Sequence, residues 1–307
     1  MAVSPYFSTV TLPRMERPYP LLLDFLAQRF PAVPRDGWEQ RLAAGKVQDE
    51  DGRPLPPDSS YVPLTRIHYF REVAAEPVIP WAEKIIFVDD EILVACKPHF
   101  LPVIPAGPYV NECLLHRLKR KTGLSDLVPV NRIDRETAGL VLFSVNRHTR
   151  GLYHDLFRQG QVEKIYQAVA ECRHPPAGTE WLVENRLVEG EPWFRMQTAA
   201  GRANARSRIR LAEIREAKAL FLLQPLTGKK HQLRLHMSGL GFRIMHDRCY
   251  PDLLPIRADD FANPLQLVAR LLRFQDPVTG RKMEFRSDRP LCWEENKVDT
   301  LPSFRWK

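Results

Sequence analysis

The sequence predicts an α+β protein whose main domain is a mixed, mostly antiparallel sheet with flanking helices. Two hairpin patterns support this prediction. Apolar runs flank an acidic turn within residues 85–96, and two others flank a Pro/Gly turn within residues 271–285. Residues 201–211 alternate polar and apolar side chains, which is typical of a strand with one packed face. Strands joined by such short turns pair antiparallel.

Helical spacing appears between these strands. Residues 111–122 carry leucines on one face and basic side chains outside, and residues 146–159 form a second helix pattern that ends at Gly160. Residues 162–170 and 221–226 are apolar runs of strand length. These elements together fill out one α+β domain.

The first part of the chain reads as a separate unit. Residues 21–30 and 38–44 have helix-like patterns, and residues 61–73 are extended. Residues 74–80 contain two prolines and serve as a linker. We therefore expect two domains, residues 1–78 and 79–307.

Composition narrows the class of protein. The net charge is +8 and the pI is near 9.3, which favours a polyanionic partner, most simply nucleic acid. No apolar run has the length of a membrane span, and no signal pattern opens the chain. The five cysteines are scattered without a Cys-x-x-Cys pair, and the histidines lack metal-ligand spacing. We expect a cytoplasmic monomer with reduced thiols, without membrane contact and without a metal site.

The most distinctive polar segment lies between two short apolar runs within residues 128–144. Here Asp134 stands between Arg132 and Arg135 on a tight connection. Nearby cations favour the ionised form of a carboxylate, which suits a nucleophile better than a general acid. Taken alone, an Arg-x-Asp-Arg segment is more often a loop ion pair than a catalytic group.

Three arginines share one face of the strand predicted at residues 201–211. Arg206, Arg208 and Arg210 alternate with packing residues, so their guanidiniums point to the same side. Arginines aligned in this way suit phosphates spaced along a nucleic-acid strand.

A helix is predicted to start near residues 227–230, because apolar side chains recur at helical spacing after it. Lys229 and Lys230 stand at its N-terminus, which favours anions. We expect both lysines to contact the phosphates of a nucleic acid.

Residues 131–140 resemble the signature loop of the RluA family of pseudouridine synthases, His-Arg-Leu-Asp-x-x-Thr-Ser-Gly-Leu. On this resemblance Asp134 is the catalytic aspartate. Tyr166 ends a Lys-x-Tyr whose tyrosine, in the family, lies against the target base. Residues 227–236 resemble the family's Thr-Gly-Arg-Thr-His-Gln-Ile-Arg-x-His, whose arginine pairs with the catalytic aspartate. That arginine is Arg234 here.

The resemblance runs from about residue 85 to residue 285, with four motif blocks in order. One departure concerns the signature loop, where Asn131 replaces the family's histidine. Ahead of this region, residues 1–78 resemble a small α/β RNA-binding module named after a ribosomal protein. The residues that carry this second resemblance are Arg41, Gly45, Lys46, Val47 and Arg71.

The resemblance implies an RNA isomerase that converts uridine to pseudouridine without a cofactor, because the base is both leaving group and returning nucleophile. Ribosomal RNA is slightly favoured over transfer RNA, since the N-terminal module is commoner on the ribosomal enzymes of the family. Arg132 then fills the gap that the unstacked uridine leaves. A catalytically silent RNA-binding or RNA-folding factor is the alternative function. A second alternative is an unrelated RNA-associated protein with a structural ion pair at Asp134.

Overall fold

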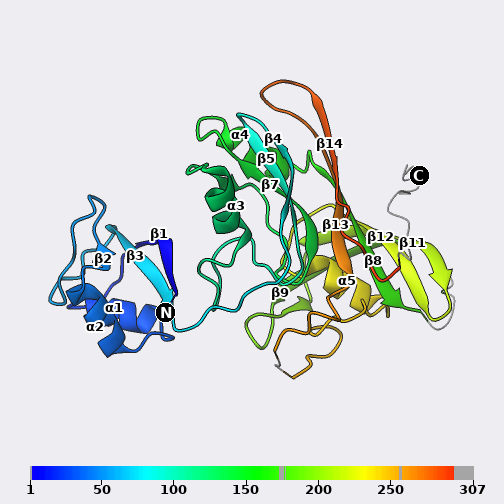
Figure 1. Ribbon diagram of the computed structural model, residues 1–307. Coiled ribbons are helices and arrows are strands. Elements are labelled where there is room, and N and C mark those ends of the chain that lie inside the picture. The colour runs from blue at the N-terminus through cyan, green and yellow to red at the C-terminus, as the bar shows by residue number, and fades with distance from the viewer. Residues whose placement is uncertain (1, 173–175, 177, 256–257, 294–307) are drawn as a thin grey trace. The chain divides into compact units, whose positions relative to one another are not determined.

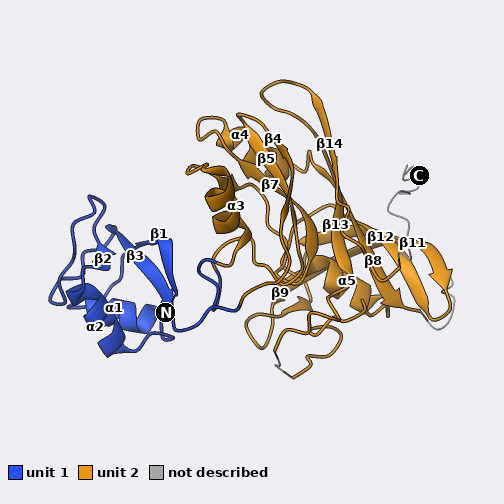
Figure 2. Cartoon of the chain, viewed as in Figure 1, with its two compact units in different colours: residues 1–77, 106–111 blue, residues 78–105, 112–307 orange. Residues whose placement is uncertain are grey.

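The computed structural model describes residues 2–172, 176, 178–255 and 258–293 (Figure 1). The chain divides into two compact units, residues 1–77 with 106–111 and residues 78–105 with 112–307 (Figure 2). Residues 106–111, which the sequence places in the second domain, pack with the first unit instead. Their contact there includes the Arg71 guanidinium, which donates to the Gly107 carbonyl at 2.7 Å.

The N-terminal unit is built from β1 (Ala2–Thr11), α1 (Leu22–Arg29), α2 (Arg35–Ala43), β2 (Val47–Gln48) and β3 (Arg66–Val73). Both helices overlap the segments predicted to be helical. The sequence pattern of residues 2–11 does not predict strand β1. It pairs antiparallel with β3, which also pairs with β2 and is the middle strand of the sheet. Leu26, Trp38 and Leu42 are buried where the helices pack.

The second unit is one large sheet with three helices in its described part. Its elements are β4 (Lys84–Val88), β5 (Ile92–Lys97), α3 (Leu114–Thr122), β6 (Val128–Pro129), β7 (Ala138–Ser144), α4 (Arg150–Arg158), β8 (Glu163–Glu171), β9 (Glu180–Glu189), β10 (Met196–Ala199), β11 (Ala205–Arg215), β12 (Lys218–Pro225), α5 (Gln232–Gly239), β13 (Leu267–Gln275) and β14 (Lys282–Arg286). The strand order is β10-β9-β11-β12-β8-β13-β7-β5-β4, with β6 beside β7 and β14 beside β13. Within the described residues, β7 and β13 pair in parallel and the other pairs are antiparallel. The predicted mixed, mostly antiparallel sheet is confirmed.

Helix α5 covers one face of this sheet (Figure 1). Its Leu233 and Met237 pack in one buried cluster with Ile209 of β11 and with Phe221 and Leu223 of β12. The helix begins somewhat later than the sequence predicts, because a turn precedes it. In the described part of the chain, we find no helix with the length and apolar character needed to cross a membrane.

The parallel contact between β7 and β13 depends on Gly139. Its backbone φ of +110° lies in a region that residues with side chains rarely adopt. An added Cβ would lie 2.3 Å from the carbonyl oxygen of Ala269 on β13. Glycine therefore lets β7 lie directly against β13, immediately after the loop that carries Asp134.

Gly139→Ala is expected to destabilise the protein by about 2–4 kcal/mol, because the new methyl group meets backbone atoms and not a movable side chain. Gly151→Ala in α4 is the matched control. Apart from its chain neighbours and the backbone of its own helix, no atom of the described residues lies within 4 Å of the added Cβ. Helix propensity therefore makes this change neutral or stabilising by up to about 1 kcal/mol. Urea denaturation of both variants measures the difference. Equal midpoints would contradict the role given to Gly139.

Candidate active site

The loop between β6 and β7 is closed by backbone pairing at its base. The Val130 amide donates to the Leu142 carbonyl at 2.8 Å, and the Leu142 amide donates to Oδ1 of Asn131 at 2.8 Å. Within the loop, the Thr137 amide donates to the Asp134 carbonyl at 3.2 Å. Asn131 thus holds the loop to β7 at the position where the RluA motif has histidine.

Lys97, at the end of β5, fastens the same loop from a second strand. Its buried ammonium donates to three carbonyl oxygens, those of Pro98, Leu101 and Arg135, at 2.9, 2.6 and 3.0 Å. Burial lowers the pKa of Lys97 to about 7, against the opposing effect of the Glu136 carboxylate. Because its three donors all reach backbone oxygens, Lys97 fixes the position of the loop relative to β5.

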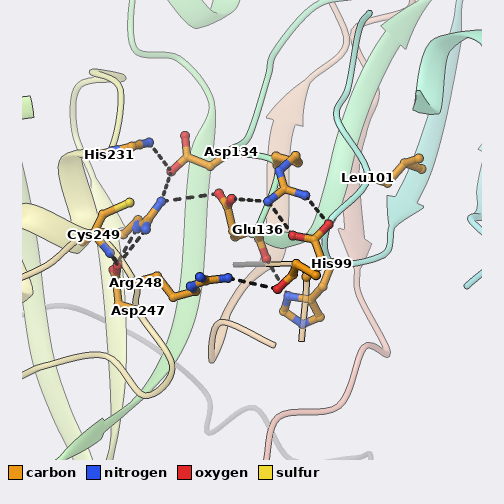
Figure 3. Close-up of polar contacts among 12 residues, drawn as sticks. His99, Leu101, Asp134, Glu136, His231, Asp247, Arg248 and Cys249 are labelled. Atoms are coloured by element: carbon orange, nitrogen blue, oxygen red, sulfur yellow. Dashed lines mark hydrogen bonds and ion pairs between the residues drawn. The ribbon is translucent and has the colours of Figure 1, made fainter. Parts of the chain in front are cut away.

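Arg234 of α5 lies at the centre of the site, with its side chain 1% exposed. Its Nε and Nη2 donate to the two carboxylate oxygens of Asp247, at 2.8 and 2.7 Å. Its Nη1 has no hydrogen-bond partner among the described residues and lies 3.7 Å from Asp134 and 3.6 Å from Glu136. Figure 3 shows the Asp134, Glu136 and Asp247 carboxylates joined by this set of ion pairs. Asp247 therefore orients the guanidinium, whose remaining edge faces the other two acids.

A second arginine extends the network beyond Glu136. Arg135 donates to Glu136 at 2.9 Å and forms a two-pronged pair with Asp259, at 2.7 and 2.9 Å. Burial alone would raise the pKa of Glu136, but the charges of Arg234 and Arg135 hold it at about 2. Glu136 is therefore an anion throughout the neutral pH range.

Asp134 opens onto a pocket of about 580 Å³, a volume in the range of small-ligand sites. The polar side chains that line it include Arg132, Asp134, Thr137, Lys164, Tyr166, Lys229, His231 and Arg234. Tyr166 of β8 supplies an aromatic ring, and burial raises the pKa of its phenol, which stays protonated. Burial also lowers the pKa of Lys164, two residues earlier on the same strand.

His231 directly precedes α5 and faces Asp134 (Figure 3). Its backbone φ of 54° is left-handed, which is uncommon for a residue other than glycine. Its Nδ1 lies 3.0 Å from the Tyr250 hydroxyl, and its Nε2 lies 4.0 Å from Oδ2 of Asp134. Burial lowers the pKa of His231, so the ring is mainly neutral at pH 7. A neutral imidazole thus lies beside the carboxylate.

The structure brings together the three side chains that the sequence predicts to be catalytic. Asp134, Tyr166 and Arg234 come from a loop, a strand and a helix, and all three line the same pocket. Arg132 and Lys229 line it as well, and both are exposed to solvent. Two of the residues predicted to contact RNA therefore lie at the mouth of the pocket.

The predicted arginine stripe consists of Arg206, Arg208 and Arg210. The three residues share one face of β11, with Ile209 on the other face. Residues that pair directly on neighbouring strands point to the same face. Ile209 pairs with Leu223, which in turn pairs with Tyr166, so these three side chains lie on the pocket side. The arginine stripe therefore faces away from the pocket.

Acidic residues of β9 lie across from two members of the stripe. Arg206 is 2.7 Å from Glu184, and Arg210 is 3.5 Å from Glu180. Exposed ion pairs of this kind partly neutralise the positive charge of the arginines, which the sequence predicts to contact RNA. The arginine stripe does not belong to the pocket, and its contact with RNA stays a prediction.

Comparison with known proteins agrees with this geometry. A family model described as RNA pseudouridylate synthase matches residues 91–239. The dual-specificity RNA pseudouridine synthase RluA of Vibrio cholerae is 32% identical over 210 residues, which cover 66% of this chain and 80% of that protein. The chain belongs to the RluA family of pseudouridine synthases. It is therefore an isomerase that acts on RNA, and the alternative of a catalytically silent RNA-binding factor is not retained.

Other relatives of this RluA-family enzyme extend the match. The tRNA pseudouridine(31) synthase of Saccharomyces cerevisiae is 26% identical and aligns with 91% of this chain and 81% of its own length. Among solved structures, human RNA pseudouridylate synthase domain containing 4 has 26% identity and a TM-score of 0.53. That match covers 67% of this chain and 88% of the human one.

Sequence reasoning misses three side chains of the RluA-family site, namely Glu136, His231 and Asp247. Glu136 and His231 stand inside segments that resemble family motifs, residues 131–140 and 227–236, so a sequence signal exists for these two. Their contacts with Asp134 and Arg234 depend on how loop, helix and sheet pack, which spacing alone does not give. In the described residues, no group of three or more His, Cys, Asp or Glu side chains is placed to hold a metal ion.

Proposed function

We propose that Asp134 carries out the isomerisation of uridine in structured RNA. The observation that carries this proposal is the position of Arg234 Nη1, a buried donor 3.7 Å from the Asp134 carboxylate in the pocket wall. A donor fixed in advance beside a reacting carboxylate stabilises its charge without reorganisation during the reaction. Glu136 is equally near Arg234 but does not line the pocket, and it is paired with Arg135. We therefore assign the chemistry to Asp134 and a positioning role to Glu136.

The reaction breaks the bond between ribose C1′ and uracil N1 and forms a bond between C1′ and C5. Asp134 acts either by attack on C1′, which gives an ester, or by removal of the 2′-hydrogen, which gives a glycal. The uracil leaves with the electron pair of the broken bond, rotates and returns through C5. The C5 hydrogen is then lost and N1 takes up a proton. Substrate and product are isomers, so the atoms balance without a co-reactant.

Two further residues have roles in this proposal. The Tyr166 ring lines the pocket beside Asp134, where it supports the detached uracil. Arg132 is exposed at the pocket, two residues before Asp134. Unstacking the target uridine costs a few kcal/mol, and the Arg132 side chain is placed to enter the gap that the uridine leaves.

Two observations bear on the RNA target, and they point to different classes of RNA. The N-terminal unit contains a hollow of about 910 Å³ whose lining includes Arg29, Arg41, Lys46 and Arg71. This supports RNA binding by that unit and, with it, the ribosomal RNA that the sequence favours. The name of the yeast relative gives a transfer RNA position, and that relative aligns with 91% of this chain. Both classes are therefore candidate substrates.

Pseudouridine mapping across total RNA, from cells with and without this protein, distinguishes the two classes. A position that loses pseudouridine in ribosomal RNA alone, or in transfer RNA alone, identifies the substrate. Purified protein must then modify the same uridine in a transcript of that RNA. Unchanged maps together with an inactive purified protein would contradict the proposal.

Lys229→Ala is expected to weaken RNA binding across sequences and to reduce the log–log salt slope by about one. Lys229 is exposed in the pocket lining, where a phosphate next to the flipped uridine can reach it. Arg208→Ala is the matched control, because it removes an equal charge from the opposite face of the sheet. Salt titrations of affinity for one labelled RNA measure both variants. An equal loss of slope would place RNA on both faces and would support the predicted contact of the arginine stripe with RNA.

A further inference from the structure

Trp193 is the most exposed large apolar side chain in the described part of the chain, at 78%. It lies in the loop at residues 190–195, which joins β9 to β10. A single exposed apolar residue is common on protein surfaces. The position of Trp193 is what distinguishes it, because hydrogen bonds hold its loop and other contacts join that loop to the active site.

The loop is held at both ends. The Gly190 amide donates to the Arg195 carbonyl at 3.1 Å, and the Arg195 amide donates to the Pro192 carbonyl at 2.8 Å. The Arg195 side chain lies over the Tyr250 ring, 5.2 Å from its centre, and donates to the Pro251 carbonyl at 2.9 Å. Trp193 therefore lies in a turn that is closed by hydrogen bonds and packed against Tyr250.

A short chain of contacts joins this turn to Asp134. The Met196 amide, directly after the loop, donates to the Tyr250 hydroxyl at 2.8 Å. The same hydroxyl lies 3.0 Å from Nδ1 of His231, whose Nε2 lies 4.0 Å from Asp134. The loop that carries Trp193 is thus linked through Tyr250 to His231, which lines the pocket.

Lys230 brings a cation to the indole. Its Nζ lies 5.5 Å from the centre of the Trp193 ring and 3.5 Å from the Trp193 carbonyl oxygen. Lys230 is exposed and follows Lys229, which lines the pocket. An exposed aromatic ring and a cation therefore lie side by side near the pocket mouth.

This pair has the chemistry of a site for single-stranded RNA. Bases stack on exposed aromatic rings whatever their sequence, and lysines attract the phosphates between them. A uridine that leaves the stack deprives its neighbours of a stacking partner. We propose that Trp193 and Lys230 form a platform on which an unpaired base near the target uridine stacks. This inference rests on the proposed function, because it requires that RNA enter at Asp134.

A fluorescein-labelled hairpin RNA with a uridine-rich loop tests the platform, together with the same hairpin carrying abasic sugars in place of the loop bases. Binding is measured by anisotropy in the Asp134→Asn background, so that turnover does not interfere. Trp193→Ala should weaken binding to the intact hairpin about 5- to 100-fold and leave binding to the abasic hairpin unchanged. Trp193→Phe should retain most of the affinity. Lys230→Ala should weaken binding to both hairpins, since phosphates remain in each.

Leu182→Ala is the matched control, because Leu182 is 51% exposed and pairs with Arg208 on the face away from the pocket. It should bind both hairpins normally. Unchanged affinity of Trp193→Ala for the intact hairpin would overturn the platform, and would leave a protein partner as the occupant of this surface. Equal losses on intact and abasic hairpins would also overturn it. Pseudouridine formation is measured separately with the protein that retains Asp134. A protein that binds RNA but forms no pseudouridine would contradict the proposed function and leave the platform to be judged by the binding data.

Discussion

Asp134→Asn is expected to lower turnover by about 10³-fold or more and to leave RNA affinity within about twofold. The amide keeps the size of the side chain but removes the charge that faces Arg234 Nη1 at 3.7 Å. Lys229 and Arg132, two of the exposed cations in the pocket lining, are untouched. Release of tritium from RNA labelled at uridine C5 measures turnover, because the reaction expels that hydrogen.

Two other carboxylates serve as comparisons for this variant. Asp90→Asn changes an exposed acid after β4 and should have no effect. Glu136→Gln changes the acid that lies as close to Arg234 as Asp134 does. We expect it to retain part of the activity, since Glu136 does not line the pocket. Tritium release by Asp134→Asn at the rate of Glu136→Gln would contradict the assignment.

Arg234→Ala is expected to abolish activity and to destabilise the fold by about 3–5 kcal/mol. The stability loss follows from Asp247, whose side chain is 1% exposed and whose two carboxylate oxygens both accept from Arg234. Removing the guanidinium leaves that buried charge without its partner. Urea denaturation measures stability, and single-turnover rates at saturating enzyme measure the chemical step.

Arg234→Lys and Asp247→Asn separate the two roles of this arginine. Lysine keeps the positive charge but cannot bind both Asp247 oxygens and also reach Asp134, so we expect partial activity. Asp247→Asn should lose stability while the folded enzyme retains more activity than Arg234→Ala, because Nη1 still faces Asp134. A wild-type single-turnover rate for Arg234→Ala would show that Arg234 is not the partner of the aspartate.

Local sequence patterns were sufficient to predict most of the helices and strands. Hairpin turns between apolar runs predicted the antiparallel pairs β4–β5 and β13–β14, and helical spacing predicted α5 apart from its start. Strand β1 was not predicted, because it forms by pairing with β3, which lies far along the chain. The place of residues 106–111 in the first unit was not predicted for a similar reason. Their place in the first unit depends on contacts with residues such as Arg71 and not on their own composition.

By itself, the sequence determined the class of reaction and the candidates for its chemistry, because the motifs around Asp134, Tyr166 and Arg234 are contiguous and their order is readable. Alternation also showed that the arginine stripe shares one face. Only the tertiary structure decided which face that is, because α5 packs on the side of Ile209 and leaves the arginines on the other. Likewise, the partners of Arg234 are acids from two separate segments, and Trp193 reaches the active site through Tyr250. Such contacts join residues far apart in sequence, and their distances are set by packing, which no local spacing encodes.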